Sequence, residues 1–169
     1  MKRNHPDMDI SEQISQIIIH NLPLFLMYAL GTILVAYFNI ILAIIFIVYI
    51  IISNIIFMIH ICAFCPHYGT RTSKCGYGLV TKYFTKRKRL KEFNKNFKKY
   101  IAVLFPDWFV PVIFGIYLLF SAFDWIIVII LIIFMVIAFG VIPFGSKSKC
   151  EKCAHRKQCP WMNITGSKV

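Results

Sequence analysis

Residues 40–62 read IILAIIFIVYIIISNIIFMIHIC, an apolar run in which Ser53 and Asn54 are the only strongly polar side chains before His60. A helix of about 20 apolar residues is long enough to cross the hydrocarbon core of a bilayer. This stretch therefore predicts a membrane-spanning helix and places the chain among all-α integral membrane proteins.

Three further apolar runs surround this segment. They cover residues 22–38, a stretch from Ile101 or Trp108 to Phe120, and residues 125–144. The polar start of the chain and the lack of a small-residue cleavage site indicate that the first run is a retained span rather than a signal peptide. Only a few residues separate spans one and two, or spans three and four, so we expect four transmembrane helices arranged as two tandem hairpins.

The positive charges follow a strict pattern along the chain. The sequence holds 19 Lys and Arg residues: Lys2 and Arg3, eleven within residues 71–99, and six from Lys147 onward. Neither short turn carries one. Lys and Arg concentrate in the cytoplasmic segments of membrane proteins, so we expect a multi-pass protein of the cell membrane with both termini in the cytoplasm.

The two halves of the chain share a register. Each half reads as a hairpin followed by Cys-x-x-Cys-x-His, which predicts a parallel repeat about an axis along the membrane normal. An offset of 88 residues relates Pro23 to Pro111, Cys62 to Cys150, Cys65 to Cys153 and His67 to His155. We divide the chain into an N-terminal cytoplasmic segment 1–21, hairpin 1 with its Cys motif 22–78, a basic segment 79–100, and hairpin 2 with its Cys motif 101–169.

The cysteines form two Cys-x-x-Cys pairs, with one further cysteine after each pair. Thiols stay reduced in the cytoplasm, and two cysteines separated by two residues can place both sulfurs on one ion. We therefore expect a cytoplasmic Cys-rich metal-binding cap. The candidate ligands are Cys62, Cys65, His67 and Cys75 in the first half, and Cys150, Cys153, His155 and Cys159 in the second.

Three arrangements of these ligands are open. Each half could build its own Cys3His zinc site, or the two Cys-x-x-Cys pairs could share one four-thiolate site. Alternatively, an iron–sulfur cluster could take four of the six thiolates. Spacing does not separate zinc from iron–sulfur. Inert cysteines and a metal-free redox dithiol are the competing interpretations.

The basic segment has a helical pattern of its own. Residues 82–99 contain nine Lys or Arg and one acidic residue, Glu92. Apolar and aromatic residues recur at helical spacing, which predicts one or two interfacial amphipathic helices with aromatics toward the acyl chains and lysines of Lys82–Lys99 toward anionic lipid. Nucleic-acid binding is not expected this close to a span. The two stripes are Leu79, Val80, Tyr83 and Phe84, and then Leu90, Phe93, Phe97 and Tyr100.

Four isolated polar residues lie near or within the spans. His20 and His60 could ligate a b-type haem, but interfacial histidines are more often solvated, so haem is not expected. Asp107 follows Pro106, and we favour its capping span three over its lying inside the membrane. We expect Asn54 to join helices by hydrogen bonds rather than to serve transport.

Two functions follow from these features. In the first, a metal site organises a platform that binds lipid or a partner protein. In the second, the chain transfers electrons between a donor and quinone or a partner subunit through an iron–sulfur cluster or a dithiol. No catalytic constellation is recognisable, and an enzymatic activity, if present, would be that of an oxidoreductase.

Overall fold

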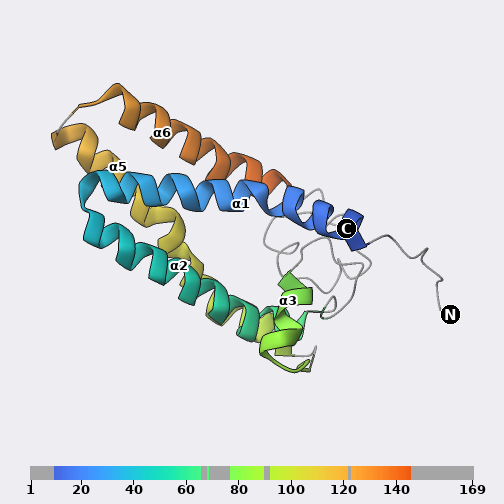
Figure 1. Ribbon diagram of the computed structural model, residues 1–169. Coiled ribbons are helices and arrows are strands. Elements are labelled where there is room, and N and C mark those ends of the chain that lie inside the picture. The colour runs from blue at the N-terminus through green and yellow to red at the C-terminus, as the bar shows by residue number, and fades with distance from the viewer. Residues whose placement is uncertain (1–9, 66–67, 69–76, 90–91, 122, 146–169) are drawn as a thin grey trace.

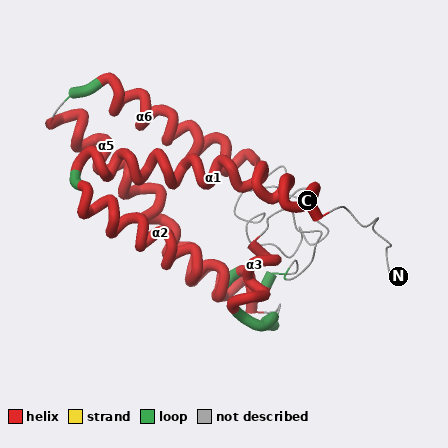
Figure 2. Tube along the Cα trace, in the orientation of Figure 1, coloured by secondary structure: helices red, strands yellow, loops and turns green. Residues whose placement is uncertain are grey.

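The computed structural model of the chain is helical, and no strand occurs among the residues that it describes (Figure 1, Figure 2). The described residues are 10–65, 68, 77–89, 92–121 and 123–145. The predicted all-helical class is thereby confirmed for this part of the chain.

Four helical stretches are long and apolar enough to cross a membrane, as predicted. They are Asn21–Phe38, Ile40–Phe64, Lys95–Ser121 and Trp125–Gly145. Their main helices are α1 (Ile10–Phe38), α2 (Ile40–His60), α5 (Phe105–Ser121) and α6 (Trp125–Met135), the last continued by the π-helical segment η4 (Val136–Val141).

Two short turns at one end of the bundle reverse the chain, and a polar side chain caps the helix after each turn. The Asn39 side chain accepts hydrogen bonds from the N–H groups of Ile41, at 2.8 Å, and Leu42, at 3.3 Å. The Asp124 carboxylate accepts one from the N–H of Ile126 at 2.9 Å. The first N–H groups of a helix have no acceptor within it, so these caps fix where α2 and α6 begin. Each hairpin then closes, because α1 packs on α2 and α5 packs on α6.

Helix α1 lies at the centre of the bundle and contacts α2, α5 and α6. It lies close to α5 and α6 at Gly31, where an added Cβ would be 2.9 Å from Cγ of Pro111 and 3.2 Å from Cε2 of Phe134. A residue without a side chain lets two helices approach this closely, which is the usual device of helix packing in membranes. The surrounding buried cluster is Met27, Leu34, Leu118, Ile127, Phe134, Ile137 and Ala138.

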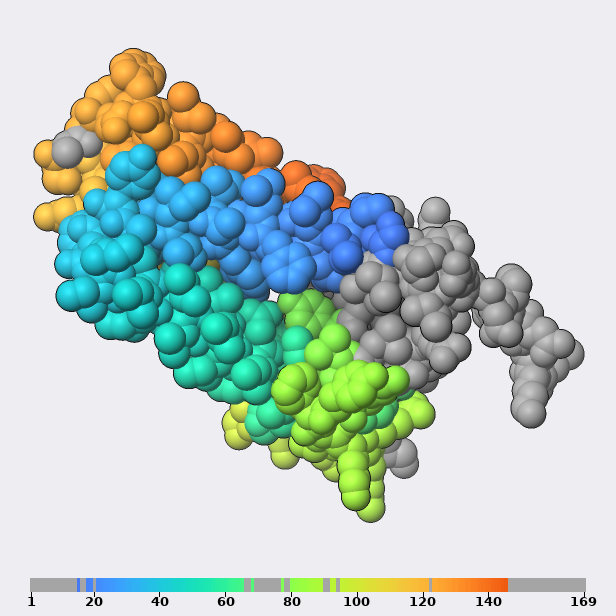
Figure 3. Space-filling model, in the orientation of Figure 1, coloured from blue at the N-terminus to red at the C-terminus, as the bar shows by residue number. Residues whose placement is uncertain are grey.

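The outer surface of the bundle is as apolar as its interior. Isoleucines such as Ile40, Ile41 and Ile44 are more than half exposed, and Phe120 is 89% exposed. In the face shown in Figure 3, α1, α2 and α6 present this surface over most of the length of the molecule. An exposed surface of Ile and Phe is unfavourable in water and favourable against lipid chains, so the surface agrees with a membrane location.

The third span begins earlier than expected. Helix α4 (Phe93–Tyr100) runs through the 3₁₀ segment η3 (Ile101–Leu104) directly into α5. Pro106 has no N–H to donate to the carbonyl of Ala102, and that carbonyl instead accepts from the N–H of Phe105. The segment η3 therefore joins the basic segment to the span without a loop.

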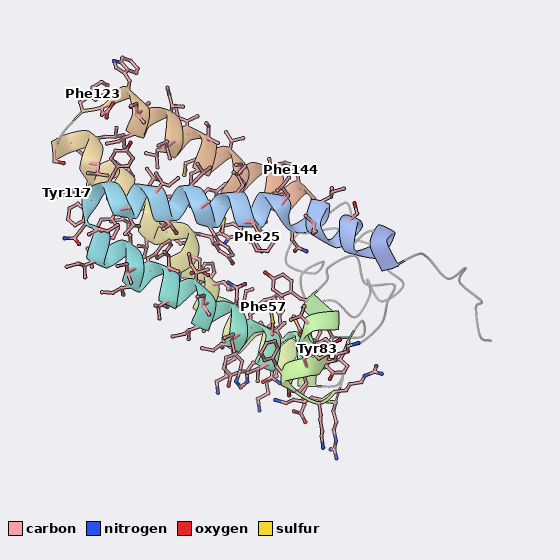
Figure 4. The ribbon with its side chains drawn as sticks, in the orientation of Figure 1. Phe25, Phe57, Tyr83, Tyr117, Phe123 and Phe144 are labelled. Atoms are coloured by element: carbon pink, nitrogen blue, oxygen red, sulfur yellow. The ribbon has the colours of Figure 1, made fainter. Side chains whose placement is uncertain are left out.

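The end of the bundle opposite the two short turns carries all the lysines and arginines among the described residues. We call it the basic end: η1 (Cys62–Phe64), α3 (Tyr77–Phe84), residues 85–89 and α4. Figure 4 shows Phe57 and Tyr83 at this end and Tyr117 and Phe123 at the other. A second buried cluster holds the basic end together, and it consists of Ile61, Ala63, Phe64, Phe93 and Phe97.

The two-helix form of the basic segment agrees with one of the predicted alternatives, but the expected orientation of its second helix is wrong. Phe93 and Phe97 were expected to face acyl chains, yet they are 8% and 6% exposed and pack on Phe64 in η1. The reason is that η1 presents its own apolar side chains at the end of α2. Burying the α4 aromatics against η1 removes apolar area from contact with water on both partners.

Candidate functional site

Two of the eight predicted metal ligands lie among the described residues. Cys62 begins η1 and is buried, and Cys65 follows its last residue and is half-buried. Within the described part of the chain, no three His, Cys, Asp or Glu side chains gather as a metal site. The other predicted ligands, His67, Cys75, Cys150, Cys153, His155 and Cys159, lie outside the described residues.

The backbone around the first pair of cysteines forms a tight turn. The N–H of Cys65 donates to the carbonyl of Cys62 at 3.1 Å, and the N–H of Tyr68 donates to the carbonyl of Cys65 at 3.0 Å. In a 3₁₀ turn, residues three apart lie one above the other on the same side. This is the relation that a Cys-x-x-Cys pair needs to place two sulfurs on one ion.

The basic segment is attached directly to this cysteine turn. The N–H of Lys88 donates to the carbonyl of Ala63 at 3.0 Å, and the Lys88 ammonium lies 5.3 Å from the centre of the Phe64 ring. The Tyr68 hydroxyl donates to the carbonyl of Thr85. Ala63 and Phe64 stand between the two cysteines, so these contacts join the cysteine turn to residues 85–88.

Helix α3 presents an uncovered apolar face beside these cations. Val80, Tyr83 and Phe84 are 42%, 79% and 58% exposed, and their spacing puts them on one side of the helix. Thr81, outside this face, is fully buried and donates to the carbonyl of Tyr77 at 2.6 Å. The cations from Lys86 to Arg89 are exposed next to this face.

The His60 side chain stacks on the Tyr100 ring with the ring centres 4.1 Å apart. It is the last residue of α2, at the basic end. This imidazole is partly buried, and the charged side chains of Lys88 and Lys99 lie near it. The side chain of His20, the other candidate haem ligand, lies outside the described part of the chain.

A second group of polar side chains lies inside the bundle and centres on Asp107. The Asp107 carboxyl is 1% exposed, and the Ser53 hydroxyl lies 2.9 Å from its Oδ2. Among the described residues its Oδ1 has no hydrogen-bond partner. The favoured interpretation of Asp107 as a helix cap is therefore wrong, because α5 has already begun at Phe105 and the carboxyl points across to α2.

Asn54 joins three helices next to this group, as its predicted structural role requires. Its amide nitrogen lies 3.0 Å from the Tyr28 hydroxyl of α1, and its amide oxygen accepts from the Tyr77 hydroxyl of α3 at 3.1 Å. The Tyr49 hydroxyl of α2 also donates to the carbonyl of Val103 at 2.6 Å. These bonds connect the membrane-spanning helices to the basic end.

The hydrogen-bonding role of these three tyrosines was not predicted from the sequence. Tyr28, Tyr49 and Tyr77 lie in apolar or glycine-rich contexts where an aromatic residue is expected to pack rather than donate a hydrogen bond. Only Ser53 and Asn54 stood out, because they interrupt the most apolar run of the chain. Tyr49 and Ser53 are four residues apart and therefore share one face of α2. That spacing is the signal that could have indicated a polar partner for Asp107 on this face.

Comparison with known proteins provides no relative. No family model, curated protein or solved structure matches the chain. The functional argument therefore depends on the residues themselves.

Proposed function

We propose that the chain is a multi-pass protein of the cell membrane whose basic end faces the cytoplasm and binds anionic lipid headgroups. The observation that carries this proposal is the exposed face of α3, Val80, Tyr83 and Phe84, next to the exposed cations from Lys86 to Arg89. Aromatics that enter the headgroup region beside lysines and arginines are the usual pattern of an interfacial helix on an anionic membrane.

The orientation follows from the distribution of charge. The described cations lie at the basic end, and the two turns at Asn39 and Asp124 carry none. The positive-inside rule then places the basic end, and both chain termini, in the cytoplasm. On that side thiols remain reduced and available to metal.

We further propose that a metal site on the Cys-x-x-Cys-x-His motifs organises this platform, with zinc or an iron–sulfur cluster as the occupant. The 3₁₀ turn at Cys62 and Cys65 suits a shared ion, and the bond from Lys88 to Ala63 ties that turn to the cationic segment. The repeated motif at 150–155 would supply the matching ligands from the second hairpin, in a parallel repeat of the first. A metal there would hold the ends of the two hairpins and the basic segment in one arrangement.

The lipid-binding proposal predicts a preference for anionic over zwitterionic lipid. Spin-labelled phosphatidylglycerol and phosphatidylcholine are compared for the fraction immobilised by the full-length protein in bilayers. Replacing Lys86, Arg87, Lys88 and Arg89 with Gln should remove most of the preference, since each cation near the surface contributes about 1 kcal/mol. The preference should also weaken as salt is raised.

The matched control keeps the charge and changes the side chains. Lys86→Arg with Lys88→Arg should retain the wild-type preference, whereas Tyr83→Ser with Phe84→Ser should reduce the immobilised fraction of both lipids. Equal immobilisation of the two lipids by the wild-type protein would overturn the proposal and leave the cations with a role in topology alone.

A further inference from the structure

Asp107 is the one acidic side chain that the described spans bury within the bundle. Helix α2 packs on it through Ser53, whose hydroxyl lies 2.9 Å from Asp107 Oδ2, and Tyr49 of α2 and Tyr28 of α1 lie near the carboxyl. Within the described residues no Lys, Arg or His forms a salt bridge with it. An isolated carboxylate in an apolar interior is unfavourable by many kcal/mol, so a membrane-buried acid indicates a functional site.

The hydrogen-bond distances around this carboxyl favour its protonated form over its ionised form. The Ser53 hydroxyl lies 2.9 Å from Asp107 Oδ2 and 3.0 Å from the carbonyl of Ile50, but it has only one proton to donate. If the carboxyl carries a proton, Oδ2 donates to Ser53 and Ser53 donates to Ile50, and both short distances are hydrogen bonds. If the carboxyl is ionised, one of the two contacts has no proton, and Oδ1 is a charged oxygen without a donor.

The enclosure of Oδ1 restricts what could neutralise the charge. This atom is inaccessible and has no described partner, so the packed bundle leaves no room beside it for a metal ion with several oxygen ligands. A proton needs no additional volume.

We propose that Asp107 and Ser53 form an intramembrane proton-binding site, occupied when α2 and α5 are packed as in this structure. Uptake forms one O–H bond on Asp107 with a proton from hydronium and leaves water, and no electron moves. Release leaves a carboxylate that the present packing does not solvate, so it requires α2 and α5 to separate or water to enter. Asn54, next to Ser53 in α2, is hydrogen bonded to Tyr28 of α1 and to Tyr77 of α3. A movement of α2 would therefore also reach α3 at the basic end.

Infrared spectroscopy of the full-length protein in bilayers tests this site directly. A protonated carboxylic acid has a carbonyl stretching band that an ionised carboxylate lacks and that shifts in D₂O. Wild type at neutral pH should show this band, and Asp107→Asn should lack it. Asp124→Asn should retain it, because that carboxyl is at the turn and Asn also caps a helix. Ser53→Ala should move the band to higher frequency, since the acid loses its acceptor.

Stability as a function of pH provides the second measurement. The packed state holds one more proton than the unfolded state, so its stability should fall as pH rises. Above about pH 4, where an Asp of the unfolded chain ionises, the ratio of folded to unfolded wild type should fall relative to Asp107→Asn by up to about tenfold per pH unit, until the packed carboxyl itself loses its proton. A wild-type spectrum identical to that of Asp107→Asn at neutral pH would overturn the proposal, and so would a pH dependence shared by both proteins.

Discussion

Wild-type protein purified without oxygen or chelator should carry stoichiometric metal, and Cys62→Ser should remove half of it or all of it. Cys62 is 7% exposed at the first position of η1, and Ser nearly matches its shape. Serine is a poor ligand for zinc or iron, so the substitution tests ligation with little change in packing. Metal content per protein, measured by elemental analysis, gives the result.

The amount lost identifies the arrangement of ligands. Loss of half the metal from Cys62→Ser, with the same loss from Cys150→Ser, indicates two independent sites. Loss of all the metal from either variant indicates one site shared by the two hairpins. In the shared case chelation should also expose the basic end to protease, because the binding energy of the metal contributes to folding. The colour of the sample separates an iron–sulfur cluster from zinc.

His60→Gln is the matched control for these variants. His60 lies two residues before Cys62 and stacks on Tyr100, but it is not a predicted metal ligand. Its replacement should leave the metal content unchanged. Wild-type protein without metal, in which Cys62 and Cys65 cycle between thiol and disulfide, would contradict the metal site and support the dithiol alternative.

Gly31→Ala should destabilise the bundle at the crossing of α1 and α5. The new methyl would lie 2.9 Å from Cγ of Pro111, a rigid ring buried within α5, and 3.2 Å from Phe134. Neither neighbour is the end of a flexible chain, so the helices must separate. Overpacking of this kind costs about 1–3 kcal/mol. Thermal unfolding in detergent, followed by circular dichroism, measures the loss.

Two other glycines serve as graded controls. An added Cβ at Gly115 would lie 2.8 Å from Cδ1 of Leu131, the end of a side chain that can rotate, so Gly115→Ala should cost less. Gly140 has nothing within 4 Å of such a Cβ, and Gly140→Ala should be neutral or stabilising, because Ala favours helix over Gly. Equal stability of the Gly31 and Gly140 variants would contradict the close crossing.

The four spans could be predicted from the sequence because the hydrophobicity of many residues adds up in each of them. Each span sums about 20 apolar residues, and tertiary context does not reverse a preference of that size. The turns at Asn39 and Asp124 were equally clear, since a polar residue between two apolar runs has few other places to lie. Nothing in the sequence required the π-helical segment at Val136–Val141, which interrupts a uniformly apolar helix.

The errors arose where one residue's environment depends on another helix. Phe93 and Phe97 follow the stripe of an interfacial helix, but η1 covers them, and no local pattern reports that η1 lies there. Asp107 after Pro106 resembles a helix cap in the sequence, but its hydrogen-bond partner is Ser53, which lies 54 residues earlier in the chain. Metal ligation by Cys62 and Cys65 remains a prediction.

Labelling with a membrane-impermeant thiol reagent tests the central claim, that the basic, cysteine-bearing end faces the cytoplasm. Phe123 is 65% exposed at the turn before α6, and Phe123→Cys places a thiol at the opposite end from Cys62. In intact cells the reagent should label Phe123→Cys and leave wild type unlabelled. Wild type should react only after permeabilisation and chelation. Labelling of wild type in intact cells, with Phe123→Cys giving no additional label, would contradict the orientation and the function built on it.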